Sequence, residues 1–326
     1  MGWTRLENDA NRLLRRLLTP SWRSIGTLAY EELRSPSPSP SPPATAFVLH
    51  GLLGTGRNWR SFSRSLVSSL SLSSPTPSEW RMILVDLRNH GKSSELQGFD
   101  PPHDMFSAAK DLSELVKSEG WDWPDAVVGH SMGGKVALQF AQSCARGDYG
   151  SSAVCPKLLW VLDSIPGEAY RSDGEVEKVL QTLHGLPSIL PSRKWLVNHM
   201  QELGFSRSLS EWIGSNLKKS GDHETWSFNL EGAIQMFHSY RETSYWSLLE
   251  EPPKGTEISI LRAENSDRWD PDVVQRLERL AGRAKDPSFG KVSYHVLPKC
   301  GHWVHVDNPK GLLDLVMPSF ASLKHT

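Results

Sequence analysis

Short apolar runs recur along the chain from about residue 46, and segments with helical periodicity separate them. Continuous apolar runs are typical of strands that are buried on both faces of a sheet. The runs lie at Ala46–Leu49, Met82–Val85, Ala126–Val128, Leu158–Leu162, Ile258–Leu261 and, less purely, Val292–Leu297. Helical patterns such as 108–117 and 135–144 lie between them. This alternation predicts an α/β fold with a mostly parallel central sheet flanked by helices.

The chain before the first of these runs carries three other patterns. Residues 1–26 interleave five arginines with leucines, which fits either an amphipathic surface helix or an organelle-targeting segment. Glu7 and Asp9 favour the surface helix, because targeting segments are poor in acidic residues. Thr27–Glu31 alternates like a half-exposed edge strand. The Ser-Pro repeat at 35–43 predicts a linker, because proline has no N–H to donate to a sheet.

The strand pattern stops between about residues 167 and 251. This stretch has helical patterns, no buried-strand signal and many Trp, Phe and Met side chains. It predicts an inserted helical lid, part of which lines an apolar substrate cavity. The expected organisation is an N-terminal segment (1–26), a first part of the core (27–166), the lid (167–251) and a second part of the core (252–326).

Composition argues against several classes of function. The 36 basic and 37 acidic side chains almost cancel, so no global field would attract nucleic acid or an anionic membrane. No apolar run approaches the roughly 20 residues that span a bilayer. Cys144, Cys155 and Cys300 show no metal-ligand spacing and predict no disulfide framework. We expect a soluble intracellular protein without cofactor or metal, cytoplasmic or, if the N-terminus is a targeting segment, mitochondrial or plastid.

The sequence Gly-His-Ser-Met-Gly at 129–133 directly follows a predicted buried strand and precedes a helical pattern. This is the context of a nucleophile elbow, in which a strained turn exposes a serine hydroxyl. A serine needs a base and stabilisation of its oxyanion product to act as a nucleophile. The pattern predicts Ser131 as the nucleophile.

Two other strand ends supply candidates for those tasks. His-Gly-Leu-Leu-Gly at 50–54 leaves an earlier strand, and the N–H groups of Leu52 and Met132 are predicted to form the oxyanion hole. Gly301-His302 follows the last strand, and His302 is the predicted base, because histidine is the last triad member in chain order behind such an elbow. His305 is assigned to the following helical region, which Asn308 is predicted to cap.

These blocks, together with Asp86-Leu87-Arg88-Asn89-His90-Gly91-Lys92-Ser93, resemble the alpha/beta-hydrolase superfamily from about Ala46 to Phe320. The resemblance is to the branch that contains small bacterial esterases with thioesterase activity and the mitochondrial abhydrolase-eleven-type proteins. It implies cofactor-free hydrolysis of esters or acyl thioesters. The loop 86–93 is expected to be structural.

The triad acid has two candidates. In most of the superfamily the acid follows the strand after the lid, where Ser266 occupies the usual position and Asp267 comes one residue late. In the resembling branch it can follow the preceding strand, which matches Asp163. We favour Asp163 and keep Asp267 as the alternative.

The sequence therefore predicts a serine hydrolase that acts on a small acyl ester or thioester through an acyl-enzyme intermediate. Two other functions stay open. His302 and Asp307 have the H-x4-D spacing of some lipid acyltransferases, and plant hormone receptors reuse this fold to bind ligands. The sequence contains no signal for an oligomeric state.

Overall fold

The computed structural model describes residues 27–35, 43–72, 79–169, 174–187, 189–284 and 286–323. The amphipathic segment 1–26 and most of the Ser-Pro repeat lie outside the described residues, so both interpretations of the N-terminus stay predictions.

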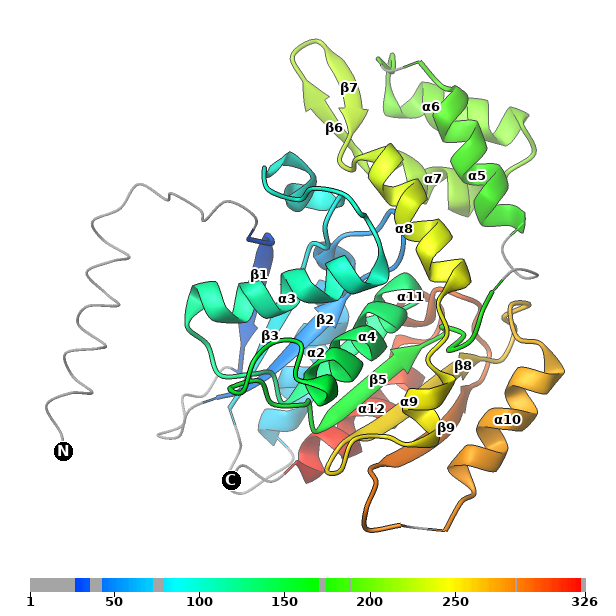
Figure 1. Cartoon of the computed structure of the whole chain (residues 1–326). Helices are drawn as coiled ribbons and strands as arrows, with labels where there is room; N and C mark the ends of the chain where they lie inside the picture. Colours follow the sequence, from blue (N-terminus) through cyan, green and yellow to red (C-terminus); the bar gives the residue numbers. More distant parts are fainter. Residues whose placement is uncertain are drawn as a thin grey trace, which may run out of the picture.

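A seven-stranded sheet forms the centre of the described part of the chain (Figure 1). In spatial order its strands are β1 (Tyr30–Arg34), β3 (Trp80–Val85), β2 (Ala44–Leu49), β4 (Ala126–His130), β5 (Leu158–Leu162), β8 (Glu257–Ala263) and β9 (Lys291–Leu297). The edge strand β1 is antiparallel to β3, and all other neighbours are parallel. The predicted fold is confirmed, although the edge strand lies three residues later than the alternation at Thr27–Glu31 indicated.

Helices cover both faces of the sheet, which explains the continuous apolar runs. On β2, Phe47 packs with α3 (Met105–Glu119) and α4 (Met132–Arg146), whereas Val48 packs with α2 (Arg60–Leu72) and α12 (Pro309–Ser322) on the opposite face. The short α9 (Trp246–Glu250) and α10 (Pro271–Ala281) cover β5 and β8 on the α4 face. The core therefore consists of two apolar layers separated by the sheet.

Local signals begin and end several of these helices. The Asp104 side chain accepts a hydrogen bond from the Ser107 N–H at the start of α3, and Gly120 ends that helix at φ 64°. Asn308 caps α12 through the Gly311 N–H, as its sequence predicts.

The insertion between β5 and β8 contains α5 (Gly174–Gly185), α6 (Arg193–Glu202), α7 (Arg207–Gly214), β6 (Leu217–Ser220), β7 (His223–Trp226) and α8 (Leu230–Glu242). Figure 1 shows most of it above the sheet. The antiparallel hairpin of β6 and β7 corrects the purely helical expectation. Its residues are half-buried or exposed, so they produce no apolar run.

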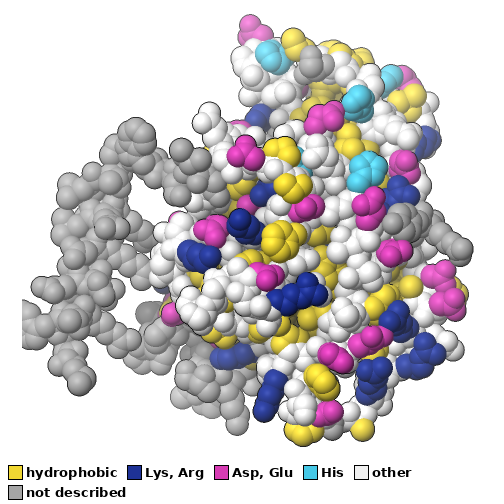
Figure 2. All heavy atoms as spheres, viewed as in Figure 1, with side chains coloured by type: hydrophobic (Ala, Val, Ile, Leu, Met, Phe, Trp, Pro, Cys, Tyr) yellow, Lys and Arg dark blue, Asp and Glu magenta, His cyan; other side chains and the backbone are white. Residues whose placement is uncertain are grey.

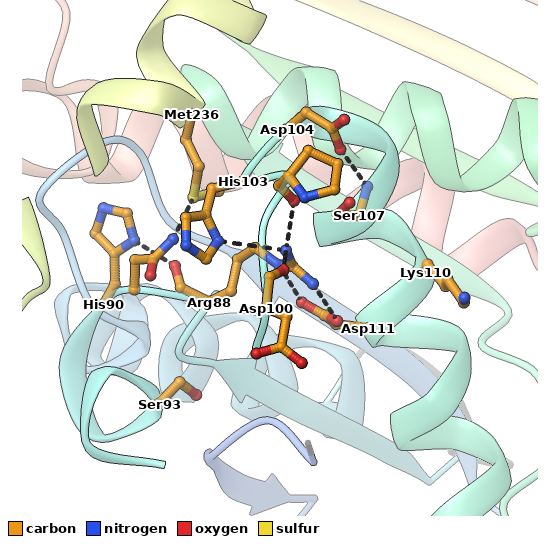
Figure 3. A network of polar contacts seen from close by, with 12 residues as sticks. Arg88, His90, Ser93, Asp100, His103, Asp104, Ser107, Lys110, Asp111 and Met236 are labelled. Atoms are coloured by element: carbon orange, nitrogen blue, oxygen red, sulfur yellow. Dashed lines mark hydrogen bonds and ion pairs between the residues drawn. The ribbon is translucent and has the colours of Figure 1, made fainter. Parts of the chain in front are cut away.

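The loop after β3 joins the sheet, α3 and the insertion (Figure 3). The buried Arg88 guanidinium donates to both oxygens of Asp111 in α3, at 2.6 and 2.8 Å, and to the Pro102 carbonyl at 2.9 Å. The next residue, Asn89, accepts at its carbonyl from the Asn229 N–H that precedes α8, at 2.8 Å. This loop therefore anchors one end of the insertion on the core.

The described surface mixes both signs of charge. Figure 2 shows Lys and Arg side chains interspersed with Asp and Glu over one face. This distribution agrees with the formal net charge of −1.

Candidate active site

Ser131 lies in a tight turn between β4 and α4, with φ 52° and ψ −121°. Such a strained backbone is typical of a nucleophile elbow. Both elbow glycines are required sterically. A Cβ at Gly129 would lie 2.2 Å from the Gly133 carbonyl oxygen, and a Cβ at Gly133 would lie 2.5 Å from that of His50. Glycine at both positions lets α4 begin in direct contact with the ends of β4 and β2.

His302 lies in the loop after β9, and its Nδ1 is 2.7 Å from Oδ2 of Asp163, which follows β5. A carboxylate can only accept a hydrogen bond, so Nδ1 carries the proton and Nε2 of the neutral ring is unprotonated. His302 and Ser131 line the same cavity. The tautomer is therefore the one that a general base for Ser131 requires.

Asp163 is held as an ionised acceptor by four hydrogen bonds. Besides His302, its donors are the Ala263 N–H at 3.0 Å, the Trp269 indole at 2.7 Å and the Ser266 hydroxyl at 2.9 Å. Burial alone would raise the pKa of Asp163, but the bonds from His302, Ala263 and Trp269 outweigh burial and lower the pKa below its ordinary value. The carboxylate is charged at neutral pH.

The alternative acid, Asp267, is exposed, whereas buried Asp163 bonds to His302. Ser266 occupies the position of the usual acid and donates to Asp163 instead. The sequence shows the serine in this position but predicts no role for it, and it predicts none for Trp269. The position of Ser266 and Trp269 just after β8 is the feature of the sequence that could indicate a role for both.

The predicted oxyanion-hole residues lie on two turns beside Ser131, and both line the cavity. Met132 is the first residue of α4, so its N–H has no acceptor within the helix. Leu52 lies in a turn that a hydrogen bond from Gly54 N–H to the Gly51 carbonyl closes at 3.0 Å. Both residues therefore lie at the cavity that Ser131 lines.

Buried His50 supports the second turn. Its Nδ1–H donates to the Gly51 carbonyl at 2.7 Å, and its Nε2 accepts from the Leu87 N–H at 3.0 Å. Burial lowers the pKa of His50 to about 4, so the ring is neutral at pH 7 and can make both bonds.

Two more histidines surround His302. His130 Nε2 donates to the His302 carbonyl at 2.8 Å. His305, in the short α11 (Val304–Asp307), stacks on Trp59 with ring centroids 4.3 Å apart and lines the cavity. Burial, together with nearby His302, lowers the pKa of His305 to about 4 and that of His130 well below its usual value. The sequence pattern assigns His305 to the following helical region and not to the site, although its i+3 spacing from His302 is a signal that the two residues lie close together.

The cavity has a volume of about 480 Å³, within the range of small-molecule sites. Apolar side chains make up much of its wall. From the insertion these are Val176, Val179, Leu209, Trp212, Phe237 and Tyr240, and from the core Leu52, Leu53, Trp59, Met132, Trp303 and Val306. The insertion and the sheet edge therefore enclose the site together.

Asp307 has a structural contact. Its Oδ2 accepts from the Gly301 N–H at 2.8 Å, next to His302, so the H-x4-D spacing here reflects a loop contact. Cys144, Cys155 and Cys300 are free thiols. The described ranges contain no group of three or more His, Cys, Asp or Glu that could hold a metal ion. None of the helices in those ranges combines the length and the apolar composition that a bilayer span requires.

A serine elbow at the carboxyl edge of a mostly parallel sheet, with a histidine and an aspartate paired beside it, defines the alpha/beta-hydrolase class. Residues 46–315 match the model of the alpha/beta hydrolase family. The chain belongs to this family.

Relatives and solved structures extend the comparison. The chain is 26% identical over 274 residues to the mouse sn-1-specific diacylglycerol lipase ABHD11, which covers 84% of this chain and 80% of that protein. It is 27% identical over 278 residues to the probable protein phosphatase methylesterase 1 of Caenorhabditis elegans, with coverage of 83% and 67%. A solved structure of a marine microorganism esterase has a TM-score of 0.67 at 23% identity, over 90% of this chain and 99% of that one. The similarity to this esterase structure shows the fold alone.

Proposed function

We propose that this protein is a serine hydrolase that cleaves carboxylic esters or acyl thioesters. Ser131 is the nucleophile, His302 the general base and Asp163 the acid of the triad. The observation that carries the proposal is the 2.7 Å bond between His302 Nδ1 and Asp163, beside the strained Ser131 turn in one cavity. The lipase and methylesterase relatives, which are named for ester substrates, support the same reaction class.

The reaction proceeds in two halves. His302 Nε2 accepts the Ser131 proton while Oγ attacks the acyl carbon, and the N–H groups of Leu52 and Met132 stabilise the oxyanion. Protonation of the departing alcohol or thiol by His302 leaves an acyl-serine. Water then gives a proton to His302 and attacks the same carbon, and the proton returns to Ser131 as the carboxylic acid leaves. Asp163 stabilises the imidazolium that forms in each half.

The insertion at 167–251 acts as the lid in this proposal. Its apolar side chains line the cavity that Ser131 shares, so an acyl chain bound there removes apolar surface from water. Acyl groups with several methylene groups are therefore expected to be better substrates than acetyl, by at most about 0.8 kcal/mol per buried methylene.

A panel of p-nitrophenyl esters and acyl thioesters from acetyl to decanoyl tests the proposal. Ser131→Ala is expected to abolish hydrolysis of every member and labelling by a fluorophosphonate probe. Ser143→Ala serves as the matched control, because Ser143 is buried in the same helix outside the cavity and accepts from the Gln139 side chain. Full activity of Ser131→Ala would refute the proposed nucleophile.

A further inference from the structure

Lys135 is a fully buried cation one turn after the nucleophile in α4, with 0% of its surface exposed. Its ammonium donates to three main-chain carbonyls, those of Gly167 at 2.7 Å, Tyr240 and Thr243 at 2.7 Å. It also lies 4.5 Å from the centre of the Tyr240 ring. The proposed chemistry gives this side chain no role.

The three acceptors require the charged form of Lys135. An ammonium has three N–H donors, whereas a neutral amine has two, so each donor here meets one carbonyl. Two of these carbonyls belong to the last turn and C-cap of α8, where helix carbonyls lack intrahelical partners and a positive charge is favourable. The aromatic face of Tyr240 adds a cation–π contact.

The three carbonyls also mark the base of the insertion. Gly167 lies where the chain leaves β5 for the insertion, and Tyr240 and Thr243 lie where it returns through α8. Neighbouring main-chain bonds join the same two segments, from Ala169 N–H to the Arg241 carbonyl at 2.9 Å and from Tyr245 N–H to the Pro166 carbonyl at 2.8 Å. Lys135 thus binds both ends of the insertion to α4, the helix that begins at the Ser131 turn. In Figure 1, α4 lies below α8.

The position of α8 matters for the cavity, because Phe237 and Tyr240 project from this helix into its wall. We propose that Lys135 is a positioning residue that sets the α8 wall of the acyl cavity by holding the base of the insertion on the nucleophile helix. This inference rests on the proposed hydrolase function. Loss of Lys135 leaves three carbonyls without their donor, and those of Gly167 and Tyr240 are buried, so the segments at 166–169 and 240–245 loosen while the Ser131 turn keeps its own bonds.

The test compares wild type with Lys135→Met, Lys135→Gln and Ser143→Ala. Ser143→Ala is the matched control, because Ser143 is a buried polar residue two turns further along α4 whose hydroxyl accepts from the Gln139 side chain, outside the cavity and outside the two segments. Hydrogen exchange is followed by mass spectrometry, and kcat and KM are measured for acetyl and octanoyl p-nitrophenyl esters. Ser131→Ala is assayed in parallel.

In Lys135→Met, exchange at 166–169 and 240–245 should rise roughly tenfold or more, and KM for the octanoyl ester should rise roughly tenfold with acetyl turnover little changed. Lys135→Gln, which keeps two donors, should be intermediate and remains informative if Lys135→Met does not fold. Unchanged exchange in these segments, an equal rise in Ser143→Ala, or equal losses on both esters would overturn the inference. Exchange is independent of catalysis, so activity retained by Ser131→Ala would refute the proposed function alone.

Discussion

The substitution Asp163→Asn tests the centre of the proposed site. It replaces one carboxylate oxygen by an NH2 group and keeps the size of the side chain. The Ala263 N–H and the Trp269 indole both donate to Oδ1, so the remaining amide oxygen is held at that position. The NH2 group must then take the place of Oδ2, facing Nδ1 of His302.

An NH2 group can only donate, so His302 must present an unprotonated Nδ1 and carry its proton on Nε2 instead. In that tautomer the ring cannot accept the Ser131 proton. The expected loss in kcat/KM is about 10⁴-fold, or about 5.5 kcal/mol of transition-state stabilisation. The loss of one charge-assisted hydrogen bond costs only about 1.5–3 kcal/mol of folding stability, so the variant should still fold.

The assay is steady-state hydrolysis of a p-nitrophenyl ester at pH 8, with circular dichroism to check the fold. Asp267→Asn is the matched control, since it makes the same chemical change at an exposed residue and should retain activity within about twofold. If Asp163→Asn keeps more than about a tenth of wild-type activity while Asp267→Asn loses it, Asp163 is not the acid and the tautomer argument fails.

Three further predictions concern the scaffold. Gly129→Ala should lose activity and about 1–3 kcal/mol of unfolding free energy through overpacking, whereas Gly174→Ala, whose Cβ meets nothing within 4 Å, should be near neutral in urea denaturation. His50 is protonated below about pH 6.5 in the unfolded chain but only below about pH 4 in the native state. Lowering the pH from 7.5 to 5.0 should therefore reduce the free energy of unfolding by about 2 kcal/mol through this residue. His50→Asn should flatten that pH dependence, and an unchanged slope in urea titrations would contradict the assignment. Asp111→Ala should destabilise by about 3–5 kcal/mol by leaving Arg88 buried and unpaired, and adding Arg88→Met should recover part of the loss; additive effects would argue against a coupled pair.

The class of fold and two elements of the site follow from short stretches of sequence. Apolar runs alternating with helical patterns predict the parallel sheet, because a strand that is buried on both faces consists of consecutive apolar residues. The elbow at 129–133 predicts the Ser131 turn, since its glycines act within five residues. Gly301-His302 is also predicted from a short stretch, because a residue that directly follows the last parallel strand lies at the same edge of the sheet as Ser131.

Only the tertiary structure brings together residues that are far apart in the chain. Asp163 meets His302 across 139 positions because β5, β8 and β9 are neighbours, and no local pattern distinguishes it from Asp267. The half-exposed β6–β7 hairpin has too little apolar periodicity to be predicted. Lys135 looks like a surface residue in sequence, and only the convergence of three distant carbonyls makes its burial favourable. Local sequence thus determines the turn that carries Ser131 and the position of His302, and tertiary packing determines which residues bond to them.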